Sequence, residues 1–356
     1  MLILSPGPAN ITDGVRAALT QADIGHRDSE FRAILRDVRA MLLEACGVSS
    51  GYRCAVMTGS GTTGIESSLT AMKGVTNGIL ILANGSYGER AAKVASVFDL
   101  PHETMNFGWT GQLDLDEIDA KCRSTDADTV YLIHHETTTG VLNPLKEIAA
   151  IGKRHNKWVM VDAVSSVCGE ELDMAGWGVD LIMGSANKCI RGVPGAGFVV
   201  VNEQLASVMQ DRRQATFVTD LVSHLEQEEK GETPFTPAVQ VFAALRVALE
   251  ELLEEGVENR IAHYERIATA LRDGLAELGL ELLLPREWYS NTMTSINMPE
   301  GFTYDRLHDE LKDQGYLIYN AQGSFQEKMF RLGTVGVMTE DDIRGFLNAL
   351  GSVLAK

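Results

Sequence analysis

Cysteine is scarce in this sequence, and positive charge is outweighed by negative charge. The 356 residues include five cysteines, at positions 46, 54, 122, 168 and 189, with neither CxxC spacing nor a Cys/His metal pattern. Their spacing therefore indicates neither a zinc site nor a disulfide framework. An odd number of cysteines scattered through apolar segments is typical of a reduced, cytoplasmic protein, and we expect that localisation.

Lysine and arginine together number 31, against 49 aspartates and glutamates, so the formal net charge is −18. This charge repels nucleic acid and anionic membranes, and we expect neither as a partner. If the substrate is an anion, individual arginines must bind it. No apolar run approaches the roughly 20 residues that span a bilayer. The start, MLILSPGPAN, has no basic segment and contains two prolines, so we do not expect a signal peptide.

Short apolar runs alternate with amphipathic stretches from about residue 50 to residue 200. The runs predict strands over 54–58, 78–83, 129–134, 157–161, 180–183 and 197–201. The stretches between them predict helices over 63–72, 88–98, 114–122 and 145–154. Such alternation, with strands rich in Val, Ile and Leu, predicts an α/β fold whose mainly parallel sheet is covered by helices on both faces.

The pattern changes beyond residue 200. Pro234 and Pro237 precede two long helical patterns, 239–254 and 258–278. Shorter predicted strands and helices follow, over 292–297, 304–314, 316–319, 329–332 and 339–354. We therefore expect an N-terminal arm and large domain over residues 1–255 and a small α+β domain over residues 256–356.

The segment 58–64, Thr-Gly-Ser-Gly-Thr-Thr-Gly, lies between a predicted strand and a predicted helix. Its glycines allow a tight turn with exposed N–H groups, and the helix start adds partial positive charge. These features suit a phosphate group. The segment lacks the lysine of a P-loop and the GxGxxG spacing of a dinucleotide site. A purely structural turn is an equal alternative.

Two more polar segments follow predicted strands. Tyr87 lies in Asn-Gly-Ser-Tyr-Gly, where small neighbours leave its ring free to lie against a planar ligand; an ordinary half-buried tyrosine is the alternative. The segment 134–140, His-His-Glu-Thr-Thr-Thr-Gly, has two histidines and a glutamate. Adjacent residues on a strand point to opposite faces, so we do not expect them to bind a metal together. Its threonines better suit hydrogen bonds to a phenolic oxygen and to backbone.

Asp162 and Lys188 each follow a buried apolar run, and Lys188 stands among small residues. A buried carboxylate needs a cation or several donors, and a pyridinium nitrogen is such a cation. A lysine placed in this way suits a covalent bond to a carbonyl carbon. Taken singly, Asp162 also fits a helix cap and Lys188 a side chain that reaches solvent. The two together, in this order, predict a pyridoxal 5′-phosphate site.

Arg331 lies within the apolar run Phe-Arg-Leu-Gly at 330–333. A guanidinium is costly there unless it binds an anion, which it can do with two parallel hydrogen bonds. An internal ion pair is the alternative.

These motifs resemble the class V aminotransferases, which are fold-type I pyridoxal-phosphate enzymes with a large domain and a smaller C-terminal α+β domain. The similarity extends over nearly the whole chain and is most specific at residues 185–195, around Lys188. Further matching segments are 5–8, 59–62, 84–88, 135–140, 161–163 and 330–333. The sequence is most similar to the branch of the family that acts on 2-aminoethylphosphonate and pyruvate.

The resemblance implies how the cofactor is held. Lys188 forms the covalent bond, Asp162 pairs the ring nitrogen, Tyr87 stacks on the ring, and Thr137 hydrogen-bonds the phenolic oxygen. The phosphate is expected to contact Ser60, Gly61 and Thr62, together with Thr236 of a partner subunit. We therefore expect a homodimer with shared active sites.

Arg331 is implied to bind the acidic group of the substrate, with Arg27 as a second candidate. For Arg27, a helix-start residue paired to Asp28 or Glu30 is the alternative. The sequence departs from the family pattern at residues 320–325 and at Arg191, three residues after the lysine. Both departures lie where we expect contacts with the substrate, so they bear on which amine is used.

The implied reaction transfers the amino group of 2-aminoethylphosphonate to pyruvate, with phosphonoacetaldehyde and L-alanine as products and a ping-pong mechanism. An alanine– or serine–glyoxylate aminotransferase is an alternative, as is a transaminase for a related aminophosphonate. A pyridoxal-phosphate lyase or desulfurase is a further alternative, although the last cysteine, Cys189, adjoins the lysine rather than lying on a late loop. A non-catalytic ligand-binding protein is the alternative of a different class.

Overall fold

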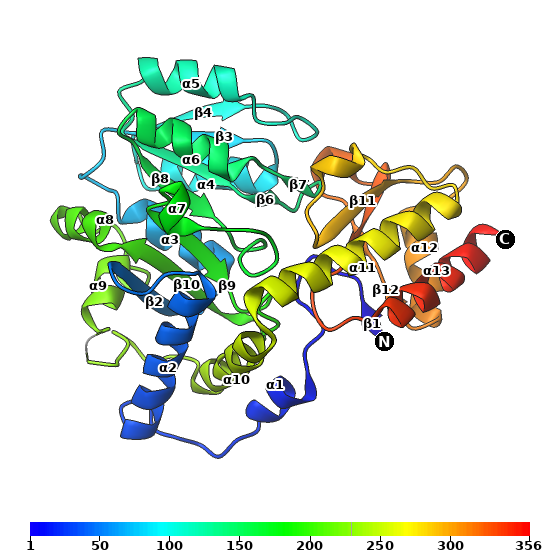
Figure 1. Ribbon diagram of the computed structural model, residues 1–356, viewed down its shortest axis with the longest axis horizontal. Helices are drawn as coiled ribbons and strands as arrows, with labels where there is room; N and C mark the ends of the chain where they lie inside the picture. Colours follow the sequence, from blue (N-terminus) through cyan, green and yellow to red (C-terminus); the bar gives the residue numbers. More distant parts are fainter. Residues whose placement is uncertain (229) are drawn as a thin grey trace.

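A seven-stranded sheet forms the centre of the larger lobe in the computed structural model, which describes residues 1–228 and 230–356 (Figure 1). Its strands, in spatial order, are β2 (Tyr52–Gly59), β10 (Gly195–Asn202), β9 (Leu181–Ser185), β8 (Trp158–Asp162), β5 (Thr129–Ile133), β3 (Ile79–Ala83) and β4 (His102–Asn106). Neighbours are parallel except at β10, which is antiparallel to both β2 and β9. The predicted mainly parallel α/β sheet is confirmed.

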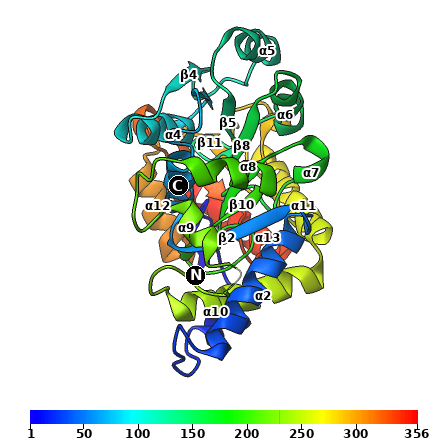
Figure 2. The same ribbon diagram turned by 90° about the vertical axis from the view of Figure 1, so that its left-hand side faces the viewer.

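Helices cover both faces of this sheet, as Figure 2 shows from the side. One face packs against α2 (Ser29–Ala45), α5 (Leu115–Ser124), α6 (Leu145–Arg154), α7 (Met174–Trp177) and α10 (Val239–Glu255). The other packs against α3 (Gly61–Thr70), α4 (Ser86–Val97), α8 (Glu203–Val208) and α9 (Leu221–Glu226). Every residue of β3, Ile-Leu-Ile-Leu-Ala, is buried. A strand buried on both faces needs such a continuous apolar run.

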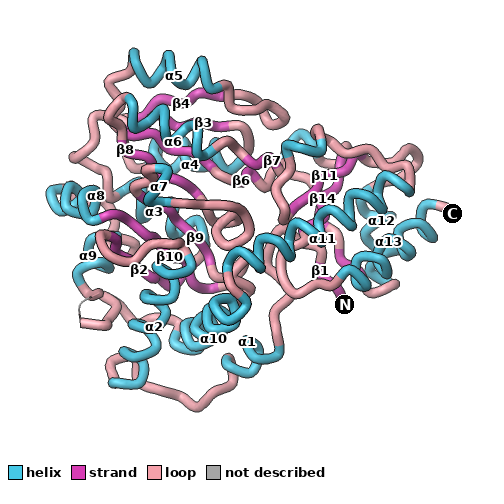
Figure 3. Tube along the Cα trace, viewed as in Figure 1, coloured by secondary structure: helices cyan, strands magenta, loops and turns pink. Residues whose placement is uncertain are grey.

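The smaller lobe contains the antiparallel sheet β11–β14–β13 (Figure 3). The strands of this sheet are β11 (Met293–Asn297), β13 (Tyr319–Asn320) and β14 (Met329–Gly333), and the lobe also contains α12 (Tyr304–Asp313) and α13 (Glu340–Leu354). The long helix α11 (Val257–Glu277) packs with them around Phe330, Leu332 and Phe346. The N-terminal strand β1 (Leu2–Ile3) pairs in parallel with β12 (Tyr316–Leu317) of this lobe. The N-terminal arm therefore reaches the smaller lobe.

The chain passes from α10 to α11 at Gly256, whose φ of 84° lies in the left-handed region that favours glycine. This break lies at the predicted domain boundary. The division into residues 1–255 and 256–356 itself stays a prediction.

Several elements were not predicted from the sequence. They include β1, α1 (Asp13–Ala18), α2, β4, the short pair β6 (His135–Glu136) and β7 (Val141–Leu142), and α7 to α9. Strand β4, His-Glu-Thr-Met-Asn, lies at the edge of the sheet and is mostly polar, so it lacks the apolar signal of a buried strand. No helix within residues 1–228 and 230–356 is long and apolar enough to cross a membrane.

Candidate active site

A cavity of about 150 Å³ lies at the carboxyl edge of the large sheet. Ligands bind at this edge in open α/β sheets, because the loops that follow the strands converge there. Seven residues predicted to hold the cofactor line this one cavity: Ser60, Gly61, Thr62, Tyr87, Thr137, Asp162 and Lys188. Segments from residue 60 to residue 188 thus meet at one site.

Lys188 follows β9 and directs its amine into the cavity, where Nζ donates a hydrogen bond to the carbonyl oxygen of Pro6. The N-terminal arm passes so close that a Cβ at Gly7 would lie 2.5 Å from Nζ. Burial lowers the pKa of Lys188 below its ordinary value. A larger fraction of the amine is therefore neutral, and only the neutral amine attacks a carbonyl or accepts a proton.

Asp162 ends β8, the strand beside β9, and is 4% exposed. Its Oδ1 accepts a hydrogen bond from the Val164 N–H at 2.9 Å. Burial raises the pKa of Asp162 to about 7. A cation in the cavity would favour the ionised carboxylate and lower that pKa. The ring nitrogen of pyridoxal phosphate, which is cationic when protonated, fits this position.

Ser60, Gly61 and Thr62 stand at the start of α3, where the first N–H groups of a helix have no intrahelical partners. The backbone comes so close to Val164 that a Cβ at Gly61 would lie 2.8 Å from that side chain. Arg90 adds a cation, because its Nη1 donates to Thr62 Oγ1 at 3.2 Å. Helix N–H groups, hydroxyls and a guanidinium together suit a phosphate ester.

Arg90 was not predicted from the sequence. It lies on α4 three residues after Tyr87, and its guanidinium stands 4.5 Å from the centre of the Tyr87 ring. The sequence does contain a signal for its position, because residues three apart on a helix lie on the same face, which brings Arg90 beside Tyr87.

Glu136 fixes the start of α4 and so the position of Tyr87. Its Oε2 accepts hydrogen bonds from the N–H groups of Tyr87 and Gly88, each at 3.2 Å. A Cβ at Gly85 would lie 2.2 Å from the Glu136 carboxyl carbon, so glycine is required there for close approach. Tyr87 lines the cavity, and a buried carboxylate sets the position of its backbone; its stacking on the cofactor ring stays a prediction.

Both histidines of the segment 134–140 are buried, and burial lowers their pKa values, to about 4 for His134 and about 3 for His135. His135 lines the cavity, and its Nε2 lies 2.8 Å from Ser290 Oγ. It is neutral at physiological pH and links the cavity to the smaller lobe. Within residues 1–228 and 230–356 no cluster of His, Cys, Asp and Glu is arranged to hold a metal.

Arg331 connects the lobes beside this cavity. Its Nη1 donates to the Thr137 carbonyl at 3.0 Å and its Nε to the Asn320 carbonyl at 2.9 Å. These bonds leave Nη2 for a ligand. Arg331 lines a neighbouring cavity of about 410 Å³ with Tyr304 and Tyr319. Among the described side chains no carboxylate forms an ion pair with Arg331. The structure therefore does not support the alternative that Arg331 makes an internal ion pair.

Arg27 and Thr236 do not reach the cavity within one chain. Arg27 Nη1 lies 3.3 Å from Glu232 Oε2 and its side chain is largely exposed, so its partner is neither Asp28 nor Glu30. Thr236 is exposed and lines a separate cavity with Thr58. Their roles toward the substrate and toward a partner subunit stay predictions.

The two departures from the family pattern have different positions. Arg191 does not line the cavity and instead bonds Tyr264, whose Oη lies 3.0 Å from Arg191 Nε. The expectation that Arg191 lies among substrate contacts is therefore wrong for this structure. The segment 320–325 does approach the site: Gln322 Oε1 accepts a hydrogen bond from Ser86 Oγ at 2.7 Å, and Phe325 stacks on Trp109 at 5.8 Å.

The five cysteines are free and buried. Cys189 is 0% exposed, and burial raises the pKa of its thiol. A buried, protonated thiol is not the mobile nucleophile that a desulfurase needs.

Comparison with known proteins places the chain in a family. Residues 17–332 match the family described as aminotransferase class-V. A relative from Vibrio cholerae serotype O1, named 2-aminoethylphosphonate–pyruvate transaminase, is 35% identical over 98% of this chain and 96% of its own.

Solved structures agree with the fold. An aspartate aminotransferase of subgroup IV from Thermus thermophilus has a TM-score of 0.90 at 25% identity and covers 100% of this chain and 99% of its own. An alanine–glyoxylate aminotransferase from Nostoc sp. has a TM-score of 0.93 at 23% identity, covering 99% and 95%. With a family match over most of its length and a relative at 35% identity, this chain belongs to the class-V aminotransferases, which depend on pyridoxal 5′-phosphate.

Proposed function

We propose that the protein transfers the amino group of 2-aminoethylphosphonate to pyruvate, which yields phosphonoacetaldehyde and L-alanine. The main support is the 35% identity over nearly the full length to a relative named for this reaction. The placement of Arg331, bonded to the backbone of the cavity residue Thr137, adds to it because both proposed substrates are anions. The proposed role is thus in phosphonate metabolism.

We assign the cofactor contacts to residues in and around the cavity. Ser60, Gly61, Thr62 and Arg90 would bind the phosphate, Tyr87 would stack on the ring, and Asp162 would pair the ring nitrogen. Thr137 would hydrogen-bond the phenolic oxygen. When bound, the cofactor supplies a carbonyl for the substrate amine and a protonated ring that delocalises the electrons left by proton removal.

Lys188 has two tasks in this proposal. Its Nζ would hold the cofactor covalently, and its amine would be free to carry protons once the amino donor is bound. The neutral amine then removes the proton from the donor carbon that carries nitrogen, and it later delivers a proton to complete the transfer. The N-terminal arm lies against Nζ, because the Pro6 carbonyl accepts its hydrogen bond and Gly7 approaches it closely. Pyruvate reverses these steps, so the kinetics are ping-pong.

Arg331 binds the phosphonate of the donor and, in the second half-reaction, the carboxylate of pyruvate. Two of its nitrogens are held by backbone carbonyls, so the guanidinium is oriented before the ligand arrives. Arg27 is the second proposed anion contact and would have to leave Glu232 to serve.

We further propose a cytoplasmic homodimer in which a second copy donates Thr236 to the phosphate. Thr236 is exposed on the chain, as a residue that serves a partner must be.

The experiment is a comparison of kcat/KM for a panel of amines with pyruvate as acceptor: 2-aminoethylphosphonate, 3-aminopropylphosphonate, alanine and serine, with glyoxylate as a second acceptor. We expect 2-aminoethylphosphonate to exceed the others by at least about tenfold, the discrimination that one misplaced methylene produces. A preference for alanine or serine with glyoxylate would identify the alternative aminotransferase. A preference for the longer phosphonate would identify a related aminophosphonate as donor.

A further inference from the structure

The turn that carries Lys188 is held in an unusual backbone conformation. Arg191 has a φ of 64°, in the left-handed region that non-glycine residues rarely adopt. Two backbone hydrogen bonds close the turn, each at 2.8 Å. The Arg191 N–H donates to the Lys188 carbonyl, and the Gly192 N–H donates to the Ala186 carbonyl. Such a conformation persists only where the surroundings enforce it.

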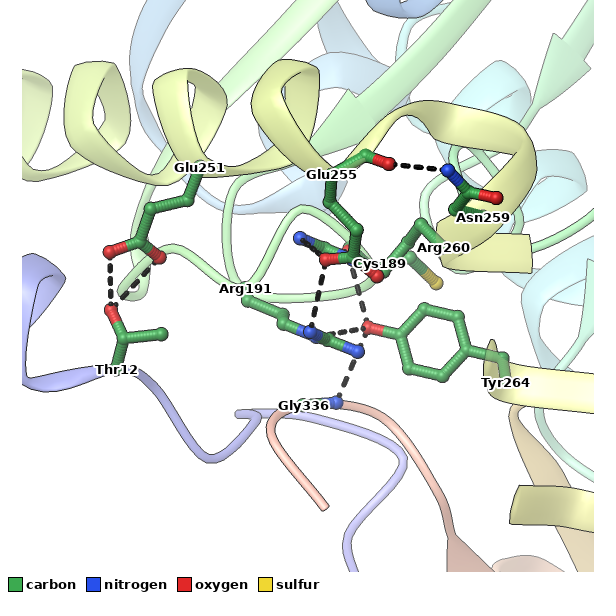
Figure 4. Close-up of polar contacts among 9 residues, drawn as sticks. All are labelled: Thr12, Cys189, Arg191, Glu251, Glu255, Asn259, Arg260, Tyr264 and Gly336. Atoms are coloured by element: carbon green, nitrogen blue, oxygen red, sulfur yellow. Dashed lines mark hydrogen bonds and ion pairs between the residues drawn. The ribbon is translucent and has the colours of Figure 1, made fainter. Parts of the chain in front are cut away.

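Side chains of the long helix α11 help to hold the turn in this conformation. The carbonyl oxygen of Cys189, the residue after the lysine, accepts hydrogen bonds from Arg260 Nη1 at 2.9 Å and from Tyr264 Oη at 3.2 Å (Figure 4). Arg260 is 2% exposed and Tyr264 is 0% exposed. On its other side the Cys189 side chain packs so tightly that a Cβ at Gly169 would lie 2.5 Å from its Sγ. The residue beside Lys188 is therefore held from both sides.

The same cluster fixes Arg191 and the junction between α10 and α11. Arg191 Nε donates to Tyr264 Oη at 3.0 Å, and its Nη1 lies 3.5 Å from Glu255, the last residue of α10. Glu255 Oε2 also accepts from Arg260 Nε and Nη2, both at 2.7 Å. Figure 4 shows Glu255 between the two arginines, with the Tyr264 hydroxyl below it. Since Tyr264 accepts from Arg191, its single proton points to the Cys189 carbonyl.

We propose that Tyr264 and Arg260 are positioning residues for Lys188, with Arg191 and Glu255 completing the link from the lysine turn to the α10–α11 junction. They act through the Cys189 carbonyl and touch neither substrate nor cofactor. The proposal rests on the assignment of Lys188 as the covalent residue.

The test uses the full chain loaded with pyridoxal 5′-phosphate and compares Tyr264→Phe with the unaltered chain. The first readout is the visible circular dichroism per mole of bound cofactor, which reports how rigidly the cofactor is oriented. The second is steady-state kinetics that determine kcat and KM separately. Loss of the hydroxyl should reduce the visible circular dichroism and lower kcat by about tenfold, with the KM of both substrates within about twofold. Arg191→Gly, which removes the guanidinium and suits the left-handed φ, should reduce the same signal.

Asn259→Ala is the matched control. Asn259 Nδ2 donates to the Glu255 carbonyl at 2.8 Å in the same junction, but Asn259 has no bond to the lysine turn. We expect this variant to keep its circular dichroism and kcat. The proposal is overturned if Tyr264→Phe and Arg191→Gly lose only thermal stability, or if Asn259→Ala lowers both readouts as much as they do. If Lys188→Ala retains the lysine-bound absorbance, the assignment of Lys188 fails instead, which separates the two ideas.

Discussion

The two sides of the cavity are built in different ways. On the side of the large lobe, Asp162 ends β8, Lys188 follows the neighbouring parallel strand β9, and Ser60 caps the helix that follows β2. On the other side, Arg331 comes from a short antiparallel sheet, and Gln322 and Pro6 come from turns and an arm. The first side holds the residues that we assign to the cofactor, and it is built on the large sheet. The contacts of the second side join segments far apart in the chain.

The largest expected effect lies on the first side. Lys188→Ala should lower kcat by about 10³-fold or more, because it removes both the covalent bond and the proton carrier. Steady-state alanine formation measures this loss. Added methylamine should restore part of the rate, since a free amine can replace the missing one. If the variant keeps normal turnover, Lys188 does not carry the chemistry.

Asp162→Asn should lower kcat/KM by about 10²-fold, the usual cost of removing one partner of a buried charge pair. Without cofactor we expect a different result: burial raises the pKa of Asp162 to about 7, and among the described residues its carboxyl forms no ion pair, so the thermal midpoint of the apo variant should not fall. Calorimetry with and without pyridoxal phosphate measures both. A large loss of apo stability would show that Asp162 is structural.

Arg331→Lys tests the second side. An ammonium cannot donate to both backbone carbonyls and also bind an anion in the guanidinium geometry, so KM for the donor and for pyruvate should each rise about 10- to 100-fold. Arg344→Lys, at an exposed ion pair with Asp341, is the control and should leave both KM values unchanged. If only one of the two KM values rises, the substrates do not share Arg331.

The last prediction concerns stability rather than turnover, at Glu170, a buried carboxyl of the large lobe that bonds Asn291 of the smaller lobe. Burial raises its pKa to about 8, and its Oε2 accepts from Asn291 Nδ2 at 3.1 Å. The folded chain binds this proton more tightly than the unfolded chain, so stability is greatest below the unfolded pKa and is lost as pH rises toward 8.

Urea unfolding of the apo chain at a series of pH values tests this sign. The free energy of unfolding should fall by up to about 1.4 kcal/mol per pH unit from this group, and Glu170→Gln should remove that part of the slope. Equal slopes in the two chains would show that Glu170 titrates normally.

The difference between the two sides also explains what the sequence could predict. Continuous apolar strands revealed the large sheet, and the polar residues that follow them, Asp162 and Lys188, were recognisable because strand ends meet at one edge. Arg331 was recognisable because a guanidinium buried in an apolar run costs free energy unless it has a partner. The Glu232 partner of Arg27 is about 200 residues away in sequence, and the turn of Arg191 toward Tyr264 depends on packing between lobes. No local pattern contains such information.

The most direct test of the central claim is a single-turnover experiment on the loaded enzyme without pyruvate. We predict that 2-aminoethylphosphonate releases one equivalent of phosphonoacetaldehyde per active site and removes the visible absorbance of the lysine-bound cofactor. Pyruvate added afterwards should release one equivalent of alanine and restore that absorbance. If phosphonoacetaldehyde does not form, or forms only when pyruvate is present, the proposed donor or the ping-pong use of Lys188 is contradicted.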